Sequence, residues 1–158
     1  MPCRSVPVEQ RARDCASGGR YAPERIENRL PAEQCDLVLV ARRKKPLEEV
    51  KKLIQKKYNC KVSTLSIDVT SNNADIKIKD FALKQLGTID VLINSAGGSR
   101  PTTWDAPESF WEEGMSLNFT ALRKLTTRII PIMTKNKWGR VINITGSVEP
   151  REVNVANA

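Results

Sequence analysis

Three apolar segments of this chain each end in residues that could contact a ligand. Residues 37–41 run into Arg42, the next segment ends at Asp68, and the third ends at Asn94, which small residues follow. An arginine can bind a phosphate group, and an aspartate can accept a hydrogen bond from an amine. Small residues let a ligand approach the backbone closely. Together these residue types suit a phosphorylated ligand that carries an amine, such as a nucleotide.

The hydrophobic pattern predicts the elements that position these residues. Short apolar runs predict strands over residues 36–41, 61–67, 89–94 and 140–144. Helical spacing predicts a first helix over residues 47–57, after Pro46. A second helix is expected from a cap at Asn72 or Asn73 through Leu86, where Gly87 ends it. A third helix is expected over residues 109–135. This alternation predicts an α/β fold, a Rossmann-like doubly wound parallel sheet. Ligands of such sheets bind beyond the carboxyl ends of the strands.

Position along these strands gives the candidate residues specific roles. Arginine at the end of the second strand of a dinucleotide-binding sheet accommodates a 2′-phosphate, so Arg42 favours NADP over NAD. Asp68 can accept from an adenine amine while the amide of Val69 donates back. The alternatives are that Arg42 is a surface cation and that the glycines after residue 94 are ordinary turn residues.

Both long helices have an apolar and a polar side. In the first, a basic face accompanies apolar residues at Leu47, Val50, Leu53 and Ile54. In the helix over residues 109–135, the residues expected inside are Phe110, Met115, Leu117, Leu122, Leu125, Ile129 and Ile132. A basic face could bind nucleic acid, but aromatic interleaving and recognised binding motifs are lacking. We therefore expect a solvated basic face and no nucleic-acid partner.

Composition excludes several classes of protein and site. The chain has 158 residues, 40% hydrophobic, a net charge of +8 and no histidine, so histidine-based hydrolysis and histidine-ligated zinc are excluded. Its four cysteines form no CxxC pair, and we expect inert thiols and no metal site. With no secretory signal or membrane-length apolar run, we expect a cytoplasmic protein without membrane contact.

The composition changes near residue 35. Residues 1–35 contain six arginines and no lysine, whereas residues 36–158 contain all thirteen lysines. The first stretch has no sustained apolar period, and it could be a flexible leader, an alternatively spliced start or sequence read out of frame. We interpret residues 1–35 as an aberrant leader and residues 36–158 as a partial nucleotide-binding domain.

Several motifs after residue 35 occur in a familiar order and spacing. They are LVLVAR at 37–42, DV at 68–69, IDVLINSAG at 89–97, SLNFT at 116–120 and WGRVINITGS at 138–147. Residues 36–158 thereby resemble the short-chain dehydrogenase/reductase family, most closely its 3-oxoacyl-[acyl-carrier-protein] reductase type. The resemblance implies an oxidoreductase that moves hydride between NADP and a small-molecule carbonyl or alcohol.

The resemblance also implies site residues. Asn94, Ala96 and Gly97 match the family's Asn-Asn-Ala-Gly element, which pins the central strand and lines the adenosine side, with Ser95 replacing the second asparagine. Asn118 matches the asparagine that kinks the long helix and takes part in proton relay. The alternative is a solvent-facing asparagine. Ser147, after a shift of one residue, matches the serine that binds the substrate carbonyl.

Two family motifs are not found. The glycine-rich turn expected with the first strand is absent from residues 1–35, and the catalytic tyrosine and lysine would fall beyond Ala158. We therefore expect a sheet without its first strand and its C-terminal part, and a truncated chain that is inactive as written. The alternative is a noncatalytic interaction protein that forms homo-oligomers through the helix over residues 109–135.

Overall fold

The computed structural model describes residues 4–8, 35–98, 100 and 102–144. Its strands are β1 (Arg4–Val8), β2 (Asp36–Ala41), β3 (Val62–Ser66), β4 (Val91–Asn94) and β5 (Arg140–Asn143). Its helices are α2 (Lys44–Lys57), α3 (Ala74–Leu86), α4 (Glu108–Met115) and α5 (Ala121–Lys135). A π-helical turn, η1 (Ser116–Thr120), joins α4 to α5.

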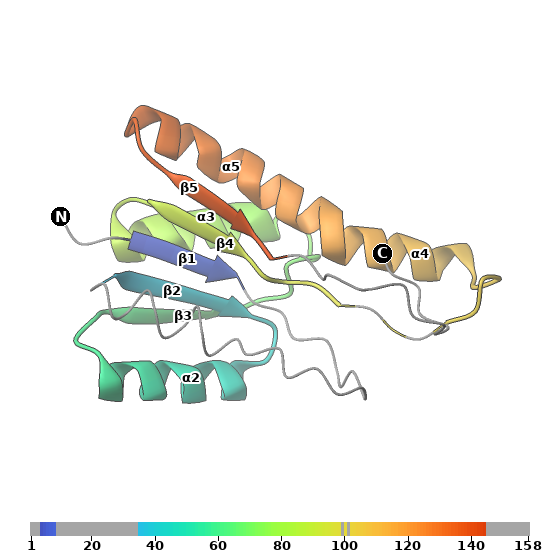
Figure 1. The fold of residues 1–158 in the computed structure, drawn as a ribbon, viewed down its shortest axis with the longest axis horizontal. Coiled ribbons are helices and arrows are strands. Elements are labelled where there is room, and N and C mark those ends of the chain that lie inside the picture. Colours follow the sequence, from blue (N-terminus) through green and yellow to red (C-terminus); the bar gives the residue numbers. More distant parts are fainter. Residues whose placement is uncertain (1–3, 9–34, 99, 101, 145–158) are drawn as a thin grey trace.

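The strands form one parallel sheet in the order β3-β2-β1-β4-β5 (Figure 1). The chain builds outward from β1 through β2 to β3, and then returns to the other side of β1 with β4 and β5. This reversal makes a switch point between β1 and β4, where doubly wound sheets bind ligands. The predicted Rossmann-like parallel fold is confirmed.

The expectation that the first strand is missing was wrong. Arg4–Val8 forms β1 at the centre of the sheet, where Val8 lies opposite Val40 of β2 and Asn94 of β4. A short segment with a proline at position 7 argues against a central strand, because proline lacks the N–H that the ladder needs. Pairing on both sides overrides that local signal.

Helices cover the sheet on both faces because side chains of β2 alternate. Leu37 and Leu39 join the apolar cluster beneath α2, which includes Leu47 and Ile54. Val38 and Val40 point the other way, into the larger cluster beneath α3 and α5. Alternation along an extended strand therefore divides the interior into two layers.

Two residues expected on apolar helix faces lie outside. Leu53 of α2 is 68% exposed, since it sits about 100° around the helix from Ile54. Met115, at the end of α4, is also exposed. The π-helical turn that follows changes the phase of the long helix, so one continuous 3.6-residue period cannot assign its faces.

The predicted ends of α3 are partly confirmed. Gly87 ends the helix with a positive φ of 78°, a conformation glycine adopts without strain. Asn73 precedes the helix, but its side chain makes no capping hydrogen bond and its backbone is left-handed. Asn73 therefore occupies the predicted N-cap position without a side-chain cap, and backbone bonds to the carbonyls of Ser71 and Asn73 begin the helix.

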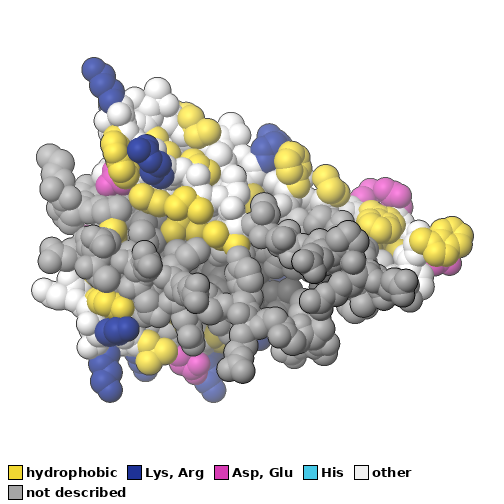
Figure 2. All heavy atoms as spheres, viewed as in Figure 1, with side chains coloured by type: hydrophobic (Ala, Val, Ile, Leu, Met, Phe, Trp, Pro, Cys, Tyr) yellow, Lys and Arg dark blue, Asp and Glu magenta, His cyan; other side chains and the backbone are white. Residues whose placement is uncertain are grey.

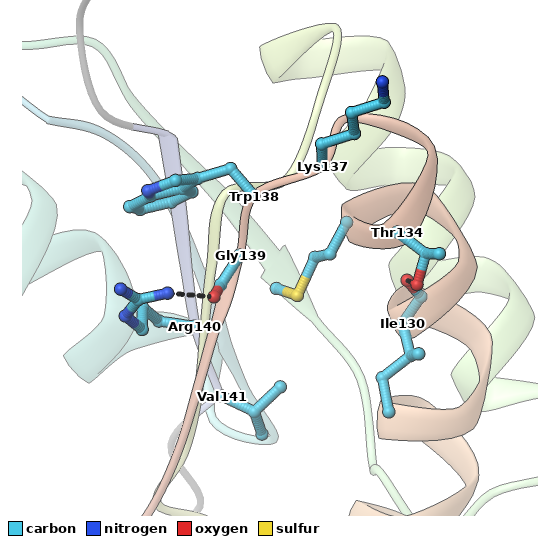
Figure 3. Close-up of a pocket in the computed structure, with 8 residues that line it drawn as sticks. Ile130, Thr134, Lys137, Trp138, Gly139, Arg140 and Val141 are labelled. Carbon is cyan, nitrogen blue, oxygen red and sulfur yellow. Dashed lines mark hydrogen bonds between the residues drawn. The ribbon is translucent and has the colours of Figure 1, made fainter.

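Exposed apolar side chains gather along α4, α5 and β5. Figure 2 shows hydrophobic side chains over this part of the molecule, and the exposed members are Met115, Phe119, Ile130, Trp138 and Ile142. A hollow of about 400 Å³ lies between the end of α5 and β5 (Figure 3). Within the described residues, no helix is both long and apolar enough to cross a bilayer.

Candidate functional site

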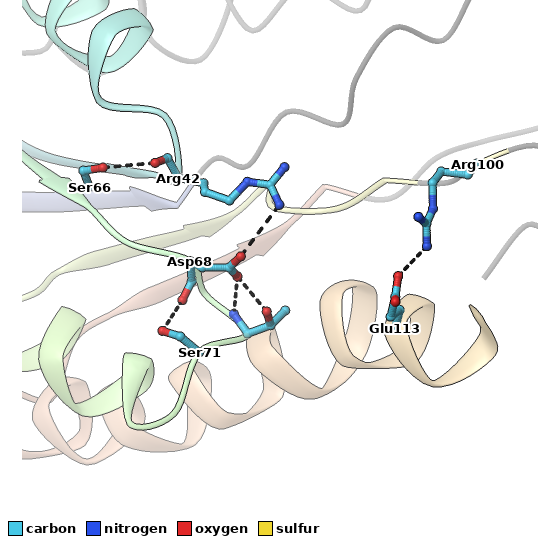
Figure 4. Close-up of polar contacts among 7 residues, drawn as sticks. Arg42, Ser66, Asp68, Ser71, Arg100 and Glu113 are labelled. Atoms are coloured by element: carbon cyan, nitrogen blue, oxygen red, sulfur yellow. Dashed lines mark hydrogen bonds and ion pairs between the residues drawn. The ribbon is translucent and has the colours of Figure 1, made fainter. Parts of the chain in front are cut away.

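Arg42 and Asp68 meet at the carboxyl edge of the sheet (Figure 4). The Ser66 hydroxyl donates to the Arg42 carbonyl at 3.0 Å and so fixes the backbone of Arg42 to the end of β3. The Arg42 guanidinium Nη1 lies 3.7 Å from Asp68 Oδ2, and the Arg42 side chain is 52% exposed. The pair presents an accessible cation beside a carboxylate.

The loop after β3 holds Asp68 in place. Its Oδ1 accepts hydrogen bonds from the Thr70 amide at 2.9 Å and the Thr70 hydroxyl at 2.6 Å. The Ser71 hydroxyl donates to the Asp68 carbonyl at 2.6 Å. Short polar side chains that bond local backbone fix turns in this way. The side chain of Val69 is buried in the core, so only its backbone is suited to face a ligand.

Asn94 ends β4 inside the protein. Its side chain is fully buried, and its Nδ2 donates to Asn143 Oδ1 at 2.8 Å and to Thr126 Oγ1 at 3.0 Å. Asn94 Oδ1 has no hydrogen-bond partner within the part of the chain that the structure describes. This amide joins β4 to β5 and α5. Thr126 and Asn143 were not predicted as partners of Asn94, although an asparagine within the apolar run of β5 was a signal.

Asn118 faces the loop that follows β4. Its Oδ1 accepts from the Gly98 amide at 2.8 Å, and its Nδ2 donates to the Gly98 carbonyl at 2.9 Å. The solvent-facing alternative for Asn118 is therefore wrong. A Cβ on Gly97 would lie 3.0 Å from Asn118 Oδ1, which explains the small residue there. Ala96, just before it, is buried.

Arg100 follows the loop after β4. It pairs with Glu113 of α4 (Figure 4), and its guanidinium lies 5.1 Å from the centroid of the Phe110 ring. Ser147 lies outside the described residues. In the part of the chain that is described, no group of three metal-ligating side chains occurs.

Comparison with known proteins identifies the lineage. The sequence pattern of the family described as short chain dehydrogenase matches residues 24–156. The chain belongs to that family. A 7alpha-hydroxysteroid dehydrogenase of Escherichia coli (strain K12) is 29% identical over 112 residues, which cover 70% of this chain and 42% of that protein. The chain thus spans less than half the length of that relative.

Solved structures have the same fold. A 7 alpha-hydroxysteroid dehydrogenase complexed with NADH and 7-oxo glycochenodeoxycholic acid aligns with a TM-score of 0.77, 24% identity, and coverage of 95% of this chain and 56% of that chain. L-sorbose reductase from Gluconobacter frateurii, complexed with NADPH and L-sorbose, aligns with a TM-score of 0.74 and 23% identity, covering 89% and 52%. Both alignments are consistent with the parallel sheet described above.

Proposed function

We propose that this short chain dehydrogenase binds NADP at the carboxyl edge of β2, β3 and β4. The observation that carries the proposal is the exposed guanidinium of Arg42, which lies 3.7 Å from Asp68 on a backbone that the Ser66 hydroxyl fixes to the end of β3. An arginine at this position suits a 2′-phosphate, because its planar group forms paired charge-assisted hydrogen bonds to phosphate oxygens. The two solved structures contain different cofactors, NADH and NADPH, so they do not decide between NAD and NADP for this chain. The proposal of NADP therefore rests on Arg42.

The neighbouring residues fit the adenosine half of this cofactor. Asp68, together with the backbone of Val69, suits an adenine edge, since a carboxylate accepts and an amide donates. Ala96 and Gly97 are small, so the cofactor can approach the backbone closely beside Asp68 and Val69. Asn94 fixes the end of β4 from inside the protein. When bound, the reduced nicotinamide would supply hydride to a carbonyl, and the oxidised nicotinamide would accept hydride from an alcohol.

We further propose catalytic roles for Asn118 and Ser147. The double hydrogen bond to Gly98 holds the Asn118 amide beside the loop after β4, where the family's asparagine takes part in proton relay. Ser147 would bind the substrate carbonyl. The family resemblance implies that a tyrosine transfers the proton. The tyrosines in the given sequence are Tyr21 and Tyr58. Tyr58 follows the C-terminal end of α2, at the opposite edge of the sheet, so we expect binding of NADP without turnover.

The proposal is tested by titrating the full chain with NADPH and with NADH. We expect tighter binding of NADPH, and we expect Arg42→Ala to weaken NADPH binding by about 10- to 100-fold while changing NADH binding little, since a charge-assisted hydrogen bond contributes about 1.5–3 kcal/mol. Arg140→Ala, an exposed arginine at the amino end of β5, is the matched control and should change neither affinity. Equal affinities in the unsubstituted chain would refute the assignment of NADP.

A second function, self-association through the long helix, is supported by its exposed apolar residues. Met115, Phe119 and Ile130, on α4, η1 and α5, are each about half exposed. We propose that this face pairs two copies of the chain. Phe119→Glu should then lower the mass measured by sedimentation to that of a monomer and leave NADPH affinity unchanged. A monomeric unsubstituted chain at high concentration would exclude this function.

A further inference from the structure

Among the large hydrophobic residues that the structure describes, Leu53 and Trp104 are the most exposed. Leu53 of α2 is 68% exposed, and Trp104, in the loop before α4, is 92% exposed. Helices α2 and α4 lie at opposite ends of the molecule (Figure 1), so these two side chains cannot cover one another within one copy of the chain. A single exposed apolar residue is common on protein surfaces, so the charges around each of the two decide what it can contact.

The surroundings of Leu53 are basic. Helix α2 contains six lysines and two glutamates, and one of these, Glu49, lies one turn before Leu53. Lys52 and Lys56 are exposed, and neither forms an ion pair with another residue that the structure describes. Residues three or four apart are neighbours on a helix surface, so Lys56 flanks Leu53. We call Leu53, Lys52 and Lys56 the lysine face.

The surroundings of Trp104 are acidic. Residues 102–115 contain four carboxylates and no lysine or arginine, and one of the four carboxylates pairs with Arg100. Glu108 and Glu112 of α4 are exposed, and neither forms an ion pair within the described ranges. Figure 2 shows acidic and hydrophobic side chains together at this end of the molecule. We call Trp104, Glu108 and Glu112 the carboxylate face.

The two faces match in charge and in spacing. Each presents two like charges four residues apart on a helix, and such pairs repel each other by themselves. Both pairs are separated by one helical turn, about 6 Å, so each lysine of one helix can reach a carboxylate of the other. Because the faces lie at opposite ends of the molecule, this match can be used only between two copies of the chain.

We propose that the lysine face of one copy binds the carboxylate face of a second copy, head to tail. The lysines would pair with the glutamates, and the two exposed apolar side chains would cover each other. A contact between two different surfaces leaves one surface of each kind free, so further copies can add at both ends. This contact is distinct from the pairing of identical faces through Phe119, because it depends on charge and salt weakens it.

The first test measures mass by sedimentation of the full chain with Phe119→Glu, so that pairing through the long helix does not contribute. At about 0.01 M ionic strength, where charges interact over about 30 Å, the mass should exceed that of a monomer and rise with protein concentration. At about 1 M, where this range is about 3 Å, the chain should be monomeric. Trp104→Ala should weaken the association about 10-fold, because buried aromatic residues contribute strongly to interfaces.

A charge exchange tests whether these two faces bind each other. In the same background, one variant carries Lys52→Glu and Lys56→Glu, and the other carries Glu108→Lys and Glu112→Lys. Each variant alone should be monomeric at low ionic strength, because its two faces then have charges of the same sign. An equal mixture should associate again, because each variant then meets a face of opposite charge.

The matched control changes the net charge by the same amount at another place. Lys77→Glu with Lys84→Glu alters two exposed positions of α3 and should leave the association unchanged. If this control abolishes the association as fully as the α2 variant, net charge rather than the lysine face is the cause, and the proposal is wrong. A monomer at every concentration in low salt, or a mixture that stays as monomeric as its two components, would also overturn it.

Discussion

The side-chain amide of Asn118 pairs with both polar backbone atoms of Gly98. Its Oδ1 accepts from the Gly98 amide at 2.8 Å and its Nδ2 donates to the Gly98 carbonyl at 2.9 Å. The pair connects the π-helical turn η1 to the loop after β4. A π-helical turn offsets the faces of the helix on either side of it, and such turns are frequent at functional sites. The Asn118 side chain thus helps to hold the loop beside the candidate adenosine site.

Replacing Asn118 should loosen this loop. Asn118→Ala removes both hydrogen bonds and leaves two partly buried backbone groups unpaired, so we expect a loss of about 1–3 kcal/mol in the free energy of unfolding. Urea denaturation measures the loss. Asn72→Ala, at an exposed position of another loop, is the control and should stay within about 0.5 kcal/mol. An Asn118→Ala chain as stable as the control would contradict a structural role for the pair.

Gly97 should be coupled to Asn118. A Cβ at position 97 would lie 3.0 Å from Asn118 Oδ1, tighter than ordinary contact. We expect Gly97→Ala to cost about 1 kcal/mol alone and less in the Asn118→Ala background, where the contacting atom is gone. A double-mutant cycle by urea denaturation gives the coupling. Fully additive losses would show that the two residues do not constrain each other.

The sequence predicted the carboxyl edge better than the contacts that brace it. Arg42 and Asp68 could be predicted to meet because parallel strands end at a common edge, and the structure brings them to 3.7 Å. The bond between Asn118 and Gly98 could not be predicted, because a π-helical turn leaves no mark in a 3.6-residue pattern. Strand β1 was missed because its proline and its shortness hide a strand that its neighbours stabilise from both sides.

Gly139 should be intolerant of any side chain. A Cβ there would lie 2.4 Å from Met133 Cγ and 2.5 Å from Met133 Cβ, and Met133 is buried. The base of the methionine side chain cannot swing away, so we expect Gly139→Ala to cost about 2 kcal/mol or more. Met133→Ala removes the contact with Cγ but keeps the contact with Cβ, and it also empties part of the core, which costs about 2–5 kcal/mol. The double variant should therefore be more stable than the sum of the two losses predicts, and thermal unfolding of all four chains measures this.

An ion pair between Asp75 and Arg128 joins α3 to α5. Arg128 Nε donates to Asp75 Oδ2 at 2.8 Å, and the Asp75 side chain is only 14% exposed, whereas Arg128 is half exposed. The hydrogen bond from Arg128 is the main cause that lowers the pKa of Asp75 below its usual value. Since Arg128 faces solvent, screening limits the contribution of the pair to about 0.5–1 kcal/mol.

This ion pair should make the stability of the protein depend on pH in one direction. Asp75 has a lower pKa in the folded chain than in the unfolded chain, so its contribution is complete above the unfolded value of about 3.9 and is lost as pH falls through the folded value. We expect Arg128→Ala to lower the free energy of unfolding by about 0.5–1 kcal/mol at pH 7, with the difference from the unsubstituted chain shrinking below about pH 4. Arg123→Ala, another exposed arginine of α5, is the control and should show no such dependence. Urea denaturation across this pH range measures the free energy of unfolding of both variants. If the loss caused by Arg128→Ala stays the same in acid, lost packing rather than the charge of Asp75 accounts for it.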